Sequence, residues 1–243
     1  MSYKNIPRLY LNKELSNNME ILLATKDSHY LKNVLRLTQK KIIRVFNGVN
    51  GEWEAIIYNK DCNKIKCSKL IKRQQSSIGP SLYFSLIKNH NLRWLLEKST
   101  ELGVKNLHPI ITDRVNLRNF NYNKAYLHLK EASEVSGRLD LPKLFKLKSL
   151  EQIILDLKRK SEHVVFCNES RKDNHLSSYF KTKFTKNISF IIGPEGGFSD
   201  NEIDLVNKHN FVKKVKIHDR VLKAETAAVL VLSIYNNYLE LID

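Results

Sequence analysis

A dense glycine loop is the part of this sequence whose residue types best suit a ligand. Gly193-Pro-Glu-Gly-Gly197 follows the apolar run 188–192 and precedes Ser199-Asp-Asn-Glu202, which has the pattern of a helix capping box. Glycines allow backbone amides and carbonyls to approach a ligand closely. The loop lacks the Lys-Ser/Thr pair of a phosphate-binding loop, and Glu195 would repel an anion. It therefore favours a cofactor with ribose hydroxyls and a positive centre, such as the sulfonium of S-adenosylmethionine; a tight turn before a helix is the alternative.

A second polar loop lies between a predicted strand ending near Ile217 and a predicted helix beginning near Ala224. Charged residues crowd this turn, and Glu225 is placed to favour the helix N-terminus. Helix capping alone would explain one such loop. Two loops that follow neighbouring strands predict a shared pocket.

The cysteines and the apolar segments exclude several other kinds of site. Cys62, Cys67 and Cys167 match neither a disulfide framework nor a zinc site, so we expect plain thiols and no metal. The longest apolar stretch, around 227–235, has about half the length that spanning a membrane requires. The first residues contain no signal-peptide core, so we expect a cytoplasmic protein without a membrane partner.

The charge of the chain points to a polyanionic partner. The 243 residues carry a formal net charge of +16 and have a pI of about 9.7. The positive electrostatic field of such a chain attracts nucleic acid, although a genome rich in Lys codons would also raise the charge. The density of positive charge is greatest at the start of the chain, where residues 1–72 contain 14 Lys and Arg against 6 Asp and Glu.

The hydrophobic periodicity changes along the chain and predicts two domains. Short alternating runs in residues 1–72, with the hairpin dipeptide Asn50-Gly51, predict a small β-barrel that carries one helix near 29–37. The polar segment 73–80 is the expected linker. In residues 73–243 strands and helices alternate, which predicts an α/β domain with a parallel sheet, helices on both faces and ligands at the carboxyl ends of the strands.

Five ordered segments resemble the RsmE family of 16S ribosomal RNA uracil-N3 methyltransferases. Two are the loops above, Gly193-Pro-Glu-Gly-Gly197 and Arg220-Val-Leu-Lys-Ala-Glu-Thr-Ala227; the others are 97–104, 109–114 and 131–142. The helix 29–36 is also similar to one in the family's leading domain. The resemblance implies a PUA-like barrel followed by a SPOUT-type domain with a trefoil knot at its carboxyl end, working as a homodimer.

The resemblance also implies the activity and its residues. The expected reaction is methyl transfer from S-adenosylmethionine to N3 of a uridine in 16S ribosomal RNA of the small subunit. Arg138, Arg220 and Glu225 are the expected catalytic residues. The expected cofactor contacts are Gly193, Pro194, Glu195, Gly196, Gly197, Ile217, His218, Leu222 and Thr226, and the expected RNA contacts are Lys32, Arg36, Arg114 and Lys223.

Some positions depart from the family pattern. Ile217 and His218 replace a Leu and a Gly, and Lys223 replaces an Arg, which keeps the charge but loses the planar fork. Val115 and Val135 replace a Ser and a Gln near the presumed substrate. These departures leave a second interpretation open, a ribosome-assembly factor of the same fold that binds RNA without catalysis. A nucleotide hydrolase is disfavoured because the chain has no phosphate loop.

Overall fold

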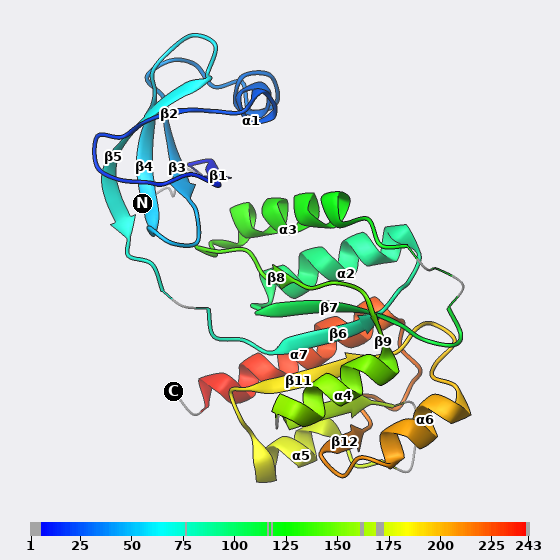
Figure 1. The fold of residues 1–243 in the computed structure, drawn as a ribbon. Helices are drawn as coiled ribbons and strands as arrows, with labels where there is room; N and C mark the ends of the chain where they lie inside the picture. The colour runs from blue at the N-terminus through cyan, green and yellow to red at the C-terminus, as the bar shows by residue number, and fades with distance from the viewer. Residues whose placement is uncertain are drawn as a thin grey trace. The chain divides into compact units, whose positions relative to one another are not determined.

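The computed structural model describes residues 6–75, 77–115, 117, 119–160, 163–168 and 173–241. Ser76 of the predicted linker and the first five residues lie outside this description. The chain forms two compact units, one of Met1–Ser76 with Ser133–Leu141, the other of Ser77–Ala132 with Pro142–Asp243 (Figure 1).

The first unit is a five-stranded sheet in the order β1-β3-β4-β5-β2 (Figure 1). Its strands are β1 (Arg8–Tyr10), β2 (Glu20–Leu22), β3 (Ile42–Phe46), β4 (Glu52–Ile57) and β5 (Lys64–Lys72). Alternate residues of these strands point inward and form one apolar core, in which Ile43, Val45, Ala55 and Ile57 are completely buried. The expected helix is a short α1 (Thr25–His29) that continues as a π-helical turn at Tyr30–Val34.

The β3–β4 hairpin is confirmed, but its turn is longer than the Asn50-Gly51 dipeptide predicts. Phe46 pairs with Glu52, so five residues form the loop. The Asn47 side chain accepts hydrogen bonds from the backbone amides of Val49 and Asn50, at 2.9 and 2.7 Å. Self-capping by Asn47 therefore replaces the two-residue turn.

The second unit is built on a parallel sheet in the order β12-β10-β11-β6-β7-β8, with β9 also paired to β7. The long strands are β6 (Ser81–Ser85), β7 (Asn106–Ile111), β10 (His163–Cys167), β11 (Ile188–Ile192) and β12 (Val212–Val215). Two short strands, β8 (Lys143–Leu144) and β9 (Lys148–Ser149), complete it. All five residues of β11 are buried, as a strand covered on both faces requires.

Helices cover both faces of this sheet, as the alternating pattern predicts. On one face pack α2 (Asn89–Glu101), α3 (Tyr122–Ser136), α5 (Leu176–Lys183) and α7 (Ala224–Glu240), and on the other α4 (Leu150–Lys160) and α6 (Asp200–Asn207). Neighbouring residues of one strand serve opposite cores: Phe190 faces α5 and α7, whereas Ile191 faces α4 and α6. No helix in the described part of the chain is long and apolar enough to cross a membrane. The trefoil knot stays a prediction.

Candidate active site

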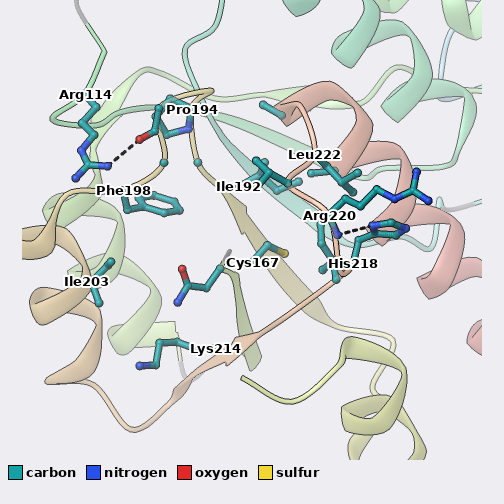
Figure 2. A pocket seen from close by; sticks show the side chains of 18 of the residues that line it. Arg114, Cys167, Ile192, Pro194, Phe198, Ile203, Lys214, His218, Arg220 and Leu222 are labelled. Atoms are coloured by element: carbon teal, nitrogen blue, oxygen red, sulfur yellow. Dashed lines mark hydrogen bonds between the residues drawn. The ribbon is translucent and has the colours of Figure 1, made fainter. Parts of the chain in front are cut away.

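A cavity of about 650 Å³ opens at the carboxyl ends of β10, β11 and β12 (Figure 2). Three loops supply most of its lining, namely the loop after β10, the glycine loop after β11 and the loop between β12 and α7, and the loop after β7 contributes Arg114. Its size suits a small-molecule ligand. Its place is the edge of a parallel sheet at which such folds bind ligands.

The glycine loop is shaped by close packing and by one left-handed residue. A Cβ atom on Gly193 would lie 2.7 Å from Cε2 of the Phe198 ring, so only glycine fits there without movement. Gly197 has a φ of +68°, and its amide donates a 2.9 Å hydrogen bond to the Pro194 carbonyl. The backbone of this loop therefore forms one wall of the cavity directly.

The helix after the glycine loop begins with the predicted capping box. The Ser199 hydroxyl accepts from the Glu202 amide, and the Glu202 carboxylate accepts from the Ser199 amide at 2.8 Å. The second Glu202 oxygen accepts from the Asp113 amide, and the Ser199 hydroxyl donates to Asp113. The guanidinium of Arg114 donates to the Gly196 carbonyl at 2.8 Å. The loop after β7 thus fixes the glycine loop in place.

The loop between β12 and α7 forms the opposite wall. Ile217 is buried and Leu222 is half-buried, and both line the cavity with Ala224 and Ala227 of α7. Nδ1 of His218 accepts a 2.9 Å hydrogen bond from the backbone amide of Arg220 (Figure 2). The imidazole at the position where the family has glycine therefore stabilises its own turn.

The loop after β10 supplies a third wall, which has no distinctive motif in the sequence. Cys167 and Asn168 line the cavity, and the Asn168 side chain donates to Asp173. Burial raises the pKa of the Cys167 thiol to about 12, so it stays protonated and serves as an apolar surface. This wall could have been predicted from the sequence, because the carboxyl end of the parallel strand 163–167 must lie at the same edge of the sheet as the glycine loop.

The structure brings most of the predicted cofactor residues together. Gly193, Pro194, Gly196, Gly197, Ile217, His218 and Leu222 all line the cavity. Glu195 and Thr226 are exposed and do not belong to the described lining. Glu195 instead accepts a 2.8 Å hydrogen bond from the Asn91 side chain at the start of α2.

The predicted catalytic residues are distributed more widely. Arg220 lines the cavity. Glu225 is only 8% exposed and does not belong to the described lining, and its Oε2 has no hydrogen-bond partner among the described residues. Arg138 belongs to the first unit, where its guanidinium pairs with Asp140 at 3.0 Å.

Of the predicted RNA contacts, only Arg114 lines the cavity. Lys32 and Arg36 are exposed residues of the first unit, and Lys32 pairs with Asp61 at 2.9 Å, which raises the pKa of the lysine. Lys223 is exposed and precedes the first residue of α7. These positions fit contacts with a large polyanion better than contacts with a small ligand.

The chemistry of the cavity wall fits a nucleoside-like cofactor. Its apolar residues can enclose a flat base, and its glycine backbone offers amides and carbonyls to polar groups. Among the described residues, the cavity has no cluster of carboxylates, histidines and cysteines that could hold a metal. The arrangement therefore suits binding and positioning of an organic cofactor.

Comparisons with known proteins also indicate a methyltransferase. Residues 74–236 match the family model described as an RNA methyltransferase domain, and residues 23–67 match an RNA methyltransferase PUA domain. The ribosomal RNA small subunit methyltransferase E of Rickettsia conorii is 30% identical over 226 residues, covering 91% of each chain.

Two solved structures have the same fold over nearly the whole chain. A methyltransferase of Legionella pneumophila, solved with the cofactor SAM bound, is 26% identical with a TM-score of 0.85, covering 96% of this chain and 98% of its own. The ribosomal RNA small subunit methyltransferase E of Neisseria gonorrhoeae, bound to S-adenosyl methionine, is 22% identical with a TM-score of 0.83 over the same shares. With the glycine loop and its cavity in the matched region, the chain belongs to the RNA methyltransferase family, as a relative of ribosomal RNA small subunit methyltransferase E.

Proposed function

We propose that this protein transfers a methyl group from S-adenosylmethionine to N3 of a uridine in 16S ribosomal RNA of the small ribosomal subunit. The observation that carries the proposal is the cavity at the ends of β10, β11 and β12, in a chain whose relatives are named ribosomal RNA small subunit methyltransferase E. The Legionella relative was solved with the same cofactor. Bound here, the cofactor would supply an electrophilic methyl group.

The cofactor would be held by the glycine loop and by the β12–α7 loop. Ile217, Leu222 and Ala227 supply an apolar surface for an adenine ring. Gly196 contributes only backbone atoms to the cavity wall. The space around it is open, because a Cβ there would meet nothing nearer than Arg114 Cβ at 3.7 Å. Transfer to a ring nitrogen is an in-line displacement, so fixing the donor in this cavity accounts for much of the expected rate.

The chain's own contribution to the chemistry concerns the charge on uracil. N3 must lose its proton, which passes to solvent, before or during transfer, and a nearby cation stabilises the anion that forms. Arg220 lines the cavity, and a guanidinium is a cation rather than a base. We assign it this role and place Arg138 second. Glu225 fits the role of proton acceptor less well, because it is buried outside the described cavity lining.

The first unit would hold the RNA around the target, since it carries an excess of basic residues and matches the PUA model. The target base must be presented unpaired or flipped out of its helix. A homodimer, as the resemblance implies, is part of the proposal.

Two measurements test the proposal. Calorimetry should show one S-adenosylmethionine site per chain, and mass spectrometry of digested 16S ribosomal RNA should show 3-methyluridine only when the protein is present. Methyl on carbon 5 or on the ribose would refute the N3 assignment. RNA binding without cofactor binding would instead support the non-catalytic assembly factor.

A further inference from the structure

One cation in the cavity wall has no role in the scheme above. Lys214 lies on β12, in register with Phe166 of β10, and lines the cavity together with Asn168 and Ile203 (Figure 2). It is half-buried, and its ammonium has no hydrogen bond or ion pair among the described residues. Its neighbour along the strand face, Lys216, is committed to Asp219 at 2.9 Å.

The other two cations of the cavity are placed differently. Arg114 donates to the Gly196 carbonyl and supports the glycine loop. Arg220 lies beside His218 and Leu222, across the cavity from Lys214 (Figure 2). Lys214 is therefore a positive charge on the Ile203 side of the described lining that does not support the glycine loop (Figure 2).

A negative charge accompanies it. Asp200, the first residue of α6, lines the same cavity and is exposed. A carboxylate and an ammonium that line one cavity without pairing with each other match a ligand that carries both charges. An α-amino acid group has this pattern, with a carboxylate for Lys214 and an ammonium for Asp200.

The apolar walls occupy the other part of the cavity. Ile192 and Leu222 lie on the side of Arg220, away from Lys214 and Ile203 (Figure 2). A ligand with a flat apolar end and a zwitterionic end would satisfy both parts at once. S-adenosylmethionine has these two ends.

We infer that Lys214 and Asp200 form the subsite for the amino-acid end of the cofactor, with Lys214 binding its carboxylate. The inference rests on the proposed function, because it takes the cavity to be the cofactor site. The sequence alone did not indicate either residue as a ligand contact, because Lys214 lies within a strand and Asp200 lies in the capping box that begins α6.

The test compares two analogues that lack the sulfonium charge of the cofactor in binding calorimetry. S-adenosylhomocysteine keeps the amino-acid end, whereas 5′-methylthioadenosine lacks it. Lys214→Met should weaken S-adenosylhomocysteine binding about tenfold or more and leave 5′-methylthioadenosine unchanged, because a charge-assisted hydrogen bond is lost only with the first. Asp200→Asn should show the same selectivity.

Lys213→Met is the matched control. Lys213 is the preceding residue of the same strand, is exposed and points to the opposite face, outside the described cavity lining. The Lys213→Met variant should bind both compounds with the affinity of the unmodified protein. If Lys214→Met weakened both compounds equally or neither, the subsite would be wrong, and a loss confined to RNA binding would assign Lys214 to a phosphate. If the unmodified protein bound neither compound, the proposed function itself would fail.

Discussion

The three glycines of the loop after β11 are needed for different physical reasons. Gly193 lies too close to the Phe198 ring for any side chain, and Gly197 has the left-handed backbone. Gly196 has neither constraint, since its backbone is ordinary and a Cβ there would make only normal contacts. We therefore expect the glycine at position 196 to leave space for the cofactor.

Gly196→Val separates cofactor binding from folding. Gly196 lines the cavity, and a Cβ there would make only ordinary contacts with Arg114, so we expect S-adenosylmethionine binding to be lost while the melting temperature changes little. Calorimetry and thermal unfolding measure the two effects. Gly193→Val is the contrast, because it forces Phe198 to move and should lower the melting temperature as well. An unchanged affinity in Gly196→Val would show that the loop does not contact the cofactor.

Arg138 tests whether a residue outside the described cavity lining takes part in catalysis. Its side chain is largely buried and pairs with Asp140, so it is held in one orientation. If its role is electrostatic, Arg138→Ala should lower turnover by about a hundredfold and leave cofactor affinity intact. Raising the pH should restore part of the rate, because solvent then assists deprotonation of N3.

The control for this prediction is Asp140→Asn, which removes the partner charge and keeps the arginine. A rate loss in Arg138→Ala without any recovery at high pH would indicate a structural role. Full activity would remove Arg138 from the mechanism.

At the scale of elements, two capping boxes allow a matched comparison. Ser199 begins α6 beside the cavity, and Ser149 begins α4, where its hydroxyl accepts from the Gln152 amide at 3.2 Å. Only Ser199 also donates to Asp113, which joins the glycine loop to the loop after β7.

Ser199→Ala and Ser149→Ala should each destabilise the protein by about 1 kcal/mol, the usual value of an N-cap. Only Ser199→Ala should also weaken S-adenosylmethionine binding, because its loss releases the glycine loop. Equal affinities in the two variants, measured by calorimetry at a temperature at which both are folded, would show that the cap does not position the site.

The elements also show which parts of the fold were predictable. Strand 188–192 and its capped helix stand out because a run of apolar residues ends at glycines and a capping box. The helix α5 (Leu176–Lys183) was missed, since only Leu176 and Phe180 of its eight residues are buried and the periodic signal is short. The strands β8 and β9 have two residues each, too few for any alternation.

The site was predictable where backbone conformation demands special residues and unpredictable where tertiary position decides. The glycine loop and the residues Ile217 to Leu222 were identified from composition and order. Lys214 was not, because the alternation in strand 212–215 cannot tell which face borders a cavity. Arg138 was expected beside the active site, but the structure groups it with the first unit. This grouping depends on contacts between residues that are distant in sequence, which a local pattern does not indicate.

At the scale of the whole molecule, the first unit cannot be removed cleanly. The Arg8 guanidinium bonds to the buried Glu52 carboxylate and to the carbonyls of Ser133, Glu134 and Arg138 at the end of α3. Deleting residues 1–72 would leave these carbonyls, and the packing of 133–141, without partners. Charge substitutions in the intact chain therefore test RNA binding better than truncation.

Lys32→Gln with Arg36→Gln is the substitution we choose. Both residues are exposed on the first unit, and neither contributes to its apolar core. If each neutralises one phosphate, the slope of log K against log salt for 16S ribosomal RNA binding should become shallower by about 1.4 to 1.8, because each contact contributes about 0.7 to 0.9. S-adenosylmethionine affinity should not change, because the cavity lies in the other unit.

Lys98→Gln serves as the control for general charge loss, since Lys98 lies on α2 of the second unit and pairs with Glu101 as Lys32 pairs with Asp61. It should leave the slope nearly unchanged. A slope that falls equally in both variants would mean that the RNA responds only to net charge, as a codon-driven excess of lysine would produce. A slope altered only in Lys32→Gln with Arg36→Gln would assign RNA binding to the first unit through defined contacts, since the two variants differ in which phosphates they can reach.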